Sequence, residues 1–250
     1  MAAKSGAKRA ADPVKGIARA SAKEVKPRRR PSTKVQQREE MMEQILDAAE
    51  YLFSRGGLHG VTLKDVAHRV GVHHTLLNYY FTDKERLFDA VIARRAGVTS
   101  SRRMEALDKY DAATKGKPTV EGALHAFLDT DLELYSRGGE NWKNYGALGA
   151  HVSNTPYGAK LMDLHFDPVV LRLIGLIKKA LPGCSLEDLF WGYHFVTGAL
   201  MLTLARTGRI DTLSGGRCKS DDFDAVKARM ASFMAAGFIA IHEKSKKGRR

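Results

Sequence analysis

The sequence predicts an all-α protein, and three observations support this class. Apolar residues recur at spacings of three and four along much of the chain from residue 38 onward, which is the period of a helix that packs on one side. Pairs such as Thr62 and Asp65, which can cap the N-terminus of a helix, come before such stretches. Glycines such as Gly56 and Gly71 stand where these helices should end. We therefore expect helices joined by short turns.

Charge and composition restrict the partners and the compartment. The 250 residues include 41 Lys and Arg against 28 Asp and Glu, a net charge of +13, which suggests nucleic acid or an anionic membrane surface as partner. Only two cysteines are present, too few for a disulfide framework, so free thiols are expected. No apolar run is long enough to span a bilayer. The sequence therefore predicts a cytoplasmic protein that does not enter the membrane.

Most of the positive charge lies at the start of the chain. Residues 1–37 contain few large apolar side chains and are expected to form a disordered basic tail. Such a tail can lie along DNA phosphates, or it can merely keep the protein soluble, and both interpretations stay open. Residues 244–250 are expected to form a second, shorter basic tail.

The segment 38–95 is predicted to contain three to four helices with a helix-turn-helix at its centre. Thr62 opens the second helix, Gly71 supplies the turn, and the third helix ends at Phe81. Thr82 and Glu85 have the spacing of a capping box for the helix that follows. In such a unit one helix braces the next, which presents its outer side chains to the major groove of DNA. We expect a DNA-binding domain.

This segment also carries a longer set of residues whose identities and spacing together form a recognisable pattern. The residues that carry it are Ile45-Leu46-Asp47-Ala48-Ala49, Phe53, Gly57, Thr62, Asp65-Val66-Ala67, Gly71-Val72, Leu77, Tyr80-Phe81, Lys84-Glu85 and Leu87-Phe88. At these positions the chain resembles the tetracycline-repressor (TetR) family of bacterial regulators. So many constrained positions in register are more specific than a helix-turn-helix pattern alone.

The resemblance implies two kinds of DNA contact. The expected phosphate contacts are Thr62, Tyr80 and Lys84, and the expected base contacts are His74, Thr75, Asn78 and Tyr79. The chemistry agrees, because Asn can pair with adenine through two hydrogen bonds and a Thr methyl group can meet a thymine methyl group. Where the family often has a Ser that caps the recognition helix, this chain has His73, which is counted among the candidate DNA-binding residues.

Neither a metal site nor an enzyme is predicted. Four histidines lie close together in the sequence, but no pair has the spacing that would put two ligands on one helical face; they are His59, His68, His73 and His74. No nucleophile elbow, phosphate loop or metal motif accompanies the acidic residues and histidines. We therefore expect no cofactor.

The second domain, residues 96–243, is predicted to be helical. The stretch 186–208 is apolar around most of its circumference, which indicates burial on two sides. The resemblance implies that this helix and the last one, from Asp222 to about His242, pair with their symmetry mates in a homodimer. This domain is thus expected to carry the dimer interface.

The resemblance also implies an effector pocket in this domain. The residues Leu189-Phe190-Trp191, His194-Phe195 and Gly198 are similar to a subgroup that contains fatty-acid-responsive regulators, so a small hydrophobic effector is expected. The candidate lining residues are Phe127, Trp142, Tyr145, Phe166, His194, Phe195 and Met201. Ordinary core packing is the alternative at each of them, because aromatic residues at helical spacing usually fill cores.

Together these features lead to one hypothesis and two alternatives. In the hypothesis, a dimeric repressor holds two recognition helices one DNA turn apart, roughly 34 Å, on a palindromic operator. Effector binding would then move the helix from Thr82 through Arg95, so that the spacing no longer fits DNA. The alternatives are an architectural protein that binds DNA of any sequence, which the basic tail would suit, and an enzyme.

Overall fold

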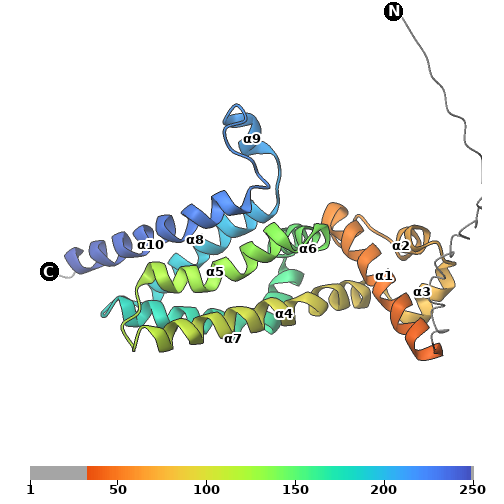
Figure 1. Ribbon diagram of the computed structural model, residues 1–250, viewed down its shortest axis with the longest axis horizontal. Coiled ribbons are helices and arrows are strands. Elements are labelled where there is room, and N and C mark those ends of the chain that lie inside the picture. The colour runs from red at the N-terminus through yellow and green to blue at the C-terminus, as the bar shows by residue number, and fades with distance from the viewer. Residues whose placement is uncertain (1–32, 249–250) are drawn as a thin grey trace, which may run out of the picture.

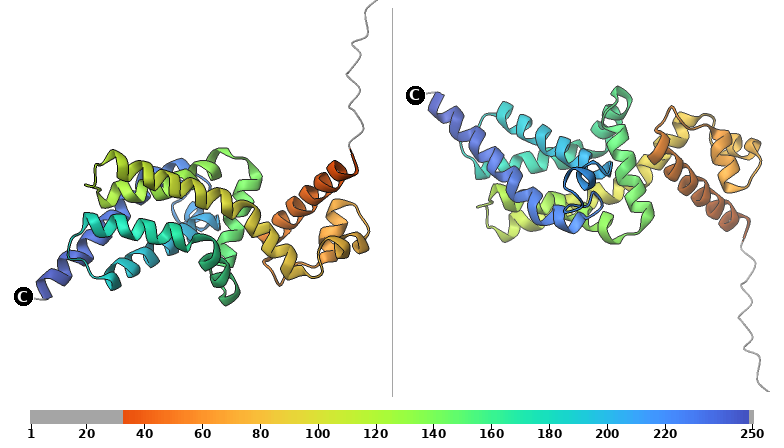
Figure 2. Two further views of the ribbon diagram at one scale, coloured as in Figure 1. Left: turned by 90° about the horizontal axis from the view of Figure 1, so that it is seen from below. Right: turned by 90° about the horizontal axis from the view of Figure 1, so that it is seen from above.

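The computed structural model describes residues 33–248, and this part of the chain forms ten helices and no strand. The helices are α1 (Lys34–Gly56), α2 (Leu63–Val70), α3 (His74–Tyr80), α4 (Lys84–Ala113), α5 (Val120–Arg137), α6 (Glu140–Val152), α7 (Pro156–Ala180), α8 (Leu186–Leu204), α9 (Arg209–Leu213) and α10 (Phe223–Gly248). Figures 1 and 2 show an elongated molecule with α1 to α3 at one end and the end of α10 at the other. The predicted all-α class is confirmed.

The N-terminal unit is formed by α1, α2, α3 and the first half of α4. Its core is closed by the side chains of Ile45, Phe53, Val66, Leu77, Leu87 and Phe88, among others. Phe53 of α1 and Phe88 of α4 meet edge to face, with ring centroids 5.0 Å apart. The periodic apolar residues of the segment thus pack as the sequence predicts.

Two helices of this unit begin elsewhere than predicted. Helix α1 starts at Lys34 because Thr33 and Gln36 form a capping box, so residues 34–37 are helical, while the rest of the predicted basic tail, 1–32, lies outside the described residues. Helix α4 is capped by Asp83, whose Oδ1 accepts a hydrogen bond from the amide of Arg86 at 2.7 Å. The predicted cap, Thr82, instead donates its hydroxyl hydrogen to Asp83.

Helix α4 is continuous across the predicted domain boundary at residues 95 and 96. Its first half belongs to the N-terminal core, and its second half packs against α5 and α7. The two cores also meet on α6 and α7, where Leu148, Val152 and Leu161 join the N-terminal cluster. Helix α4 is therefore part of both cores.

The C-terminal unit is a bundle of the second half of α4 with α5, α7, α8 and α10, and α6 lies across the junction to α1. Helix α10 packs along α5 and α8 and extends to Gly248. Residues 244–248 of the predicted tail are therefore helical, and residues 249 and 250 lie outside the described residues. Helix α8 ends at Leu204, before the predicted end at 208. The chain then turns through positive φ angles at Arg206 and Gly208 into a projecting segment that carries α9.

Candidate DNA-binding surface and ligand cavity

Helix α2 and the turn after it are fixed by local hydrogen bonds. The Thr62 hydroxyl accepts from the amide of Asp65 at 3.2 Å, and the Asp65 carboxylate accepts from the Thr62 amide at 2.8 Å. The hydrogen bonds from the Thr62 side chain and backbone lower the pKa of Asp65. Gly71 has a φ of 81°, a left-handed conformation that suits glycine, and this turns the chain toward α3.

The recognition helix α3 is capped by an imidazole in place of a hydroxyl. Nδ1 of His73 lies 2.8 Å from the Thr75 hydroxyl oxygen and accepts a long hydrogen bond, 3.5 Å, from the Thr75 amide. The departure from the family pattern at His73 is therefore accommodated by the same kind of N-terminal cap. Because His73 and Thr75 bond to each other, each side chain restricts the orientation of the other.

The outer face of α3 is exposed while its inner face is buried. Leu77 is fully buried in the N-terminal core, whereas the neighbouring Tyr79 is 71% exposed. The structure places the predicted base contacts His74, Thr75, Asn78 and Tyr79 on this exposed face together with His73. The predicted phosphate contacts lie around it: Thr62 is exposed, and Tyr80 and Lys84 are half-buried.

Arg38 belongs to the same surface, although the sequence did not single it out. Its guanidinium carbon lies 5.9 Å from the ring centroids of both Tyr79 and Tyr80. The two tyrosine rings are themselves packed edge to face. Arg38 thus adds a positive charge beside the recognition helix and restricts Tyr79 by cation–π contact.

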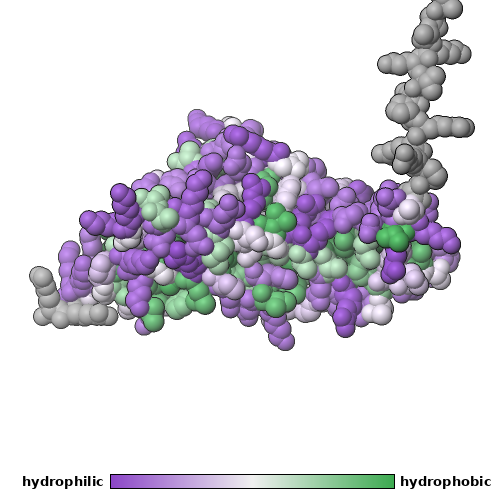
Figure 3. Space-filling model, turned by 60° about the horizontal axis from the view of Figure 1, so that its bottom comes forward, coloured by the Kyte–Doolittle hydropathy of each residue, from purple (hydrophilic) through white to green (hydrophobic). Residues whose placement is uncertain are grey.

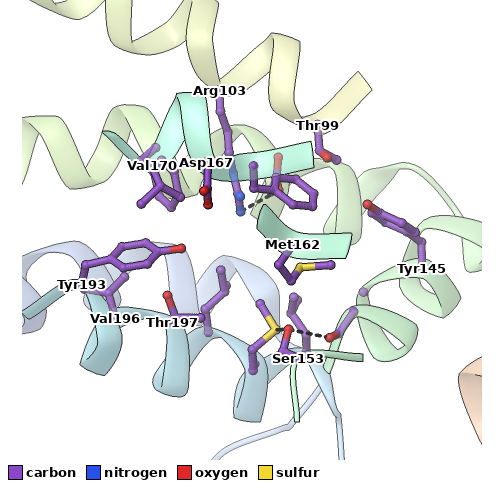
Figure 4. Close-up of a pocket in the computed structure, with 18 of the residues that line it drawn as sticks. Thr99, Arg103, Tyr145, Ser153, Met162, Asp167, Val170, Tyr193, Val196 and Thr197 are labelled. Carbon is purple, nitrogen blue, oxygen red and sulfur yellow. Dashed lines mark hydrogen bonds and ion pairs between the residues drawn. The ribbon is translucent and has the colours of Figure 1, made fainter. Parts of the chain in front are cut away.

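The C-terminal unit encloses a cavity of about 280 Å³ between α4, α5, α6, α7 and α8 (Figure 4). Four of the predicted lining residues border it, namely Phe127, Tyr145, Phe166 and Met201. The other three do not. Trp142 packs edge to face on Tyr145 from outside the cavity, and His194 and Phe195 lie on the outward face of α8.

The outward placement of His194 and Phe195 corrects the predicted pocket. Phe195 is 54% exposed and stacks on Trp191, which is exposed as well. The α8 residues that line the cavity are instead Tyr193, Val196, Thr197, Leu200, Met201 and Leu204. The apolar stretch 186–208 has two apolar faces, and sequence periodicity alone did not indicate which of them faces the cavity.

A buried ion pair belongs to the polar part of the cavity wall. Nη2 of Arg103 lies 2.8 Å from Oδ2 of Asp131, and the guanidinium carbon is 4.3 Å from the ring centroid of Phe127. Burial raises the pKa of Asp131, and the positive charge of Arg103 opposes that shift. Burial and the nearby Asp131 raise the pKa of Tyr135 well above its usual value.

Sequence reasoning missed this pair. Asp131 interrupts the apolar stripe of α5, and Arg103 stands in a polar, basic stretch of α4. The available signal was the break itself, because a charged residue within a buried stripe requires a partner of opposite charge.

Contacts through α6 join the cavity to the N-terminal unit. Tyr145 lines the cavity and packs on Trp142, and the guanidinium carbon of Arg95 lies 4.8 Å from the centroid of the Trp142 ring. Arg95 in turn donates from Nε to Oε2 of Glu50 in α1 at 2.6 Å. An unbroken series of contacts therefore runs from the cavity wall to the helix that supports α2 and α3.

Two family models match the chain and together cover more than half of it. Residues 45–91 match the model described as "Bacterial regulatory proteins, tetR family", and residues 125–237 match "Tetracyclin repressor-like, C-terminal domain". The chain belongs to the TetR family. It is thus a DNA-binding transcriptional regulator, and the regulators of this family are not enzymes.

Relatives and solved structures agree with this TetR-family membership. The regulator BetI of Escherichia coli O17:K52:H18 is 24% identical over 166 residues, which cover 66% of this chain and 83% of BetI. The structure of FadR from Bacillus subtilis in complex with stearoyl-CoA matches with a TM-score of 0.56 at 15% identity, over 78% of this chain and 98% of FadR. HlyIIR, a hemolysin II regulator, matches with a TM-score of 0.52 at 16% identity, over 78% and 97%. The two solved structures share the fold.

Other classes of site are not apparent in the part of the chain that the structure describes. Residues 33–248 contain no group of three or more His, Cys, Asp and Glu side chains placed to hold a metal ion. Within the same range no helix is both long and apolar enough to cross a bilayer.

Proposed function

We propose that the chain is a ligand-released repressor that binds a palindromic operator as a homodimer. The observation that carries this proposal is that one molecule combines an exposed recognition helix with a cavity, and that α4 and α6 connect the two. A protein that only coats DNA would need the first feature and not the second. The cavity therefore favours regulation over an architectural role.

The exposed face of α3 would read the operator. His74, Thr75, Asn78 and Tyr79 would contact base edges, with His73 beside them as the cap of the helix. Thr62, Tyr80 and Lys84 would bind phosphates, and the position of Arg38 next to Tyr79 suggests a further phosphate contact.

Exposed apolar side chains on α8 and α10 support the homodimer. They are Leu186, Phe190, Trp191, Phe195 and Leu202 of α8 and Phe233 and Ile239 of α10. Figure 3 shows apolar patches on an otherwise mostly hydrophilic surface. A surface of this kind on two antiparallel helices suits an isologous contact with a second copy, which would place two recognition helices on two half-sites.

The effector would act by moving the cavity wall. A ligand that displaces Tyr145 also displaces Trp142, and through it Arg95 and Glu50, so the position of α1 and α4 changes. Thr99 and Arg103 line the cavity from α4 itself, which gives a second, direct connection to the N-terminal unit. In a dimer either movement would alter the distance between the recognition helices, and the operator would be released.

The test combines footprinting with two substitutions. A regulator protects one short palindrome, whereas uniform protection of any DNA would support the architectural alternative. Lys84→Ala is expected to weaken binding to all sequences alike. It should also reduce the slope of the logarithm of the binding constant against the logarithm of the salt concentration by the amount of about one phosphate contact. Tyr79→Ala is expected to reduce the preference for the operator, and Lys109→Ala on the distal half of α4 serves as the control. If Tyr79→Ala leaves the preference intact, the assignment of α3 as the reader is wrong.

A further inference from the structure

The cavity is lined by more negative than positive side chains. The carboxylates of Asp131, Asp163 and Asp167 border it, and among the described residues Arg103 is the one cationic side chain that does so. Arg103 is paired with Asp131 at 2.8 Å. Within residues 33–248 neither Asp163 nor Asp167 forms an ion pair. The lining therefore carries a net charge of −2, and of −1 even when Asp131 is protonated.

The buried pair leaves hydrogen-bonding capacity unused. Asp131 is 1% exposed, and its Oδ1 makes no hydrogen bond of good geometry, although the phenol of Tyr135 is close to it. Nε of Arg103, a donor, is also buried without a partner. The acceptor Oδ1 of Asp131 can be satisfied by a ligand that donates a hydrogen bond, and orphaned buried polar atoms are rare in folded proteins.

Arg103 is poorly placed to receive an anionic ligand. Its side chain is held by Asp131 on one side and by the Phe127 ring on the other. An arriving carboxylate would have to compete with Asp131 for the guanidinium group. It would also have to pass Asp163 and Asp167, which are exposed and therefore lie where the cavity opens to solvent. Their negative charges repel an anion.

Much of the remaining lining is apolar. Ile92, Met162, Met201 and Leu204 belong to it, together with Gly146 and Gly149 of α6. A volume of about 280 Å³ corresponds to roughly nine water molecules, so the cavity suits a ligand of about ten non-hydrogen atoms. Figure 4 shows Arg103, Asp167, Tyr193 and Thr197 pointing into the same space as Met162.

We propose that the effector is a small amphipathic amine whose protonated nitrogen lies between Asp163 and Asp167 and whose apolar part lies against Met162 and Met201. The aromatic rings of Tyr193 and Phe166 border the same space and can add cation–π attraction. This inference rests on the proposed function, since it takes the cavity as the effector site. It replaces the fatty-acid-like effector that the sequence resemblance implied with one of opposite charge.

The test compares three probes of equal length and different charge: n-octylamine, n-octanol and n-octanoate, each titrated calorimetrically into the full chain at neutral pH. Octylamine is expected to bind about tenfold more tightly than octanol, and octanoate more weakly than both. Asp163→Asn combined with Asp167→Asn should abolish the preference for the amine over the alcohol. Asp221→Asn, an exposed carboxylate outside this cavity, is the matched control.

A further variant locates the binding site. A Cβ atom at Gly149 would meet no heavy atom within 4 Å, so Gly149→Leu can fill the cavity without a clash at its first atom and should abolish octylamine binding. Octanoate binding as tightly as octylamine, no binding of octylamine, or an unchanged preference in the double variant would each overturn the proposal. Operator binding without any probe is measured separately, so loss of the amine proposal is distinguishable from loss of the repressor proposal.

Discussion

Glu50 of α1 is the carboxylate whose replacement is expected to cost the most stability. It is 1% exposed, and Oε2 accepts hydrogen bonds from Nε of Arg95 at 2.6 Å and Nη2 of Arg94 at 3.0 Å. Glu50→Gln keeps the shape but leaves two largely buried guanidinium groups without the shared counter-charge. Breaking a buried pair in this way costs about 3–5 kcal/mol. Because Arg94 keeps Glu43 and Asp47, we expect the lower end, about 3 kcal/mol.

The measurement is urea unfolding followed by circular dichroism at one fixed protein concentration, because a dimer's apparent stability depends on concentration. Glu133→Gln is the control, since its ion pair with Arg137 is exposed and is expected to contribute less than about 1 kcal/mol. If Glu50→Gln lowers the free energy of unfolding by no more than Glu133→Gln does, then the buried carboxylate does not hold α1 to α4, and the proposed route from the cavity to the recognition helix loses its last contact.

Two further substitutions test other parts of the fold. Hydrogen bonds from Lys179 and Arg172 hold the pKa of Asp111 below its ordinary 3.8, so the carboxylate stabilises the fold above that pH and this contribution is lost as the pH falls through the lower folded-state pKa. The melting temperature of Asp111→Asn should therefore lie below that of the parent at pH 7 and approach it as the pH falls below 3.8. In Gly192→Ala the new Cβ would lie 2.2 Å from a ring carbon of Phe238, which should cost about 1–3 kcal/mol of unfolding free energy. Gly175→Ala, where nothing lies within 4 Å, should cost nothing.

The sequence by itself determined the class of the protein and the helix-turn-helix. Thr62 and Asp65 cap helix α2, Gly71 ends it, and Leu77 turns inward from α3. The cap and the turn depend on contacts between residues a few positions apart, so the sequence alone indicates them. Where two local caps competed, the sequence was insufficient: Asp83 caps α4 although Thr82 has the expected spacing with Glu85. Both side chains are good caps, and only the backbone geometry at that turn selects between them.

Only the tertiary structure decided how the cavity is built. Arg103 and Asp131 come from different helices and meet because α4 packs along α5. Trp142, His194 and Phe195 are of residue types that often line pockets, yet they lie outside this cavity. Helical periodicity identifies apolar faces, but which face meets a neighbouring helix, a second copy or an internal cavity depends on the packing of several helices at once. The charge of the cavity, and with it the proposed class of effector, follows from that packing.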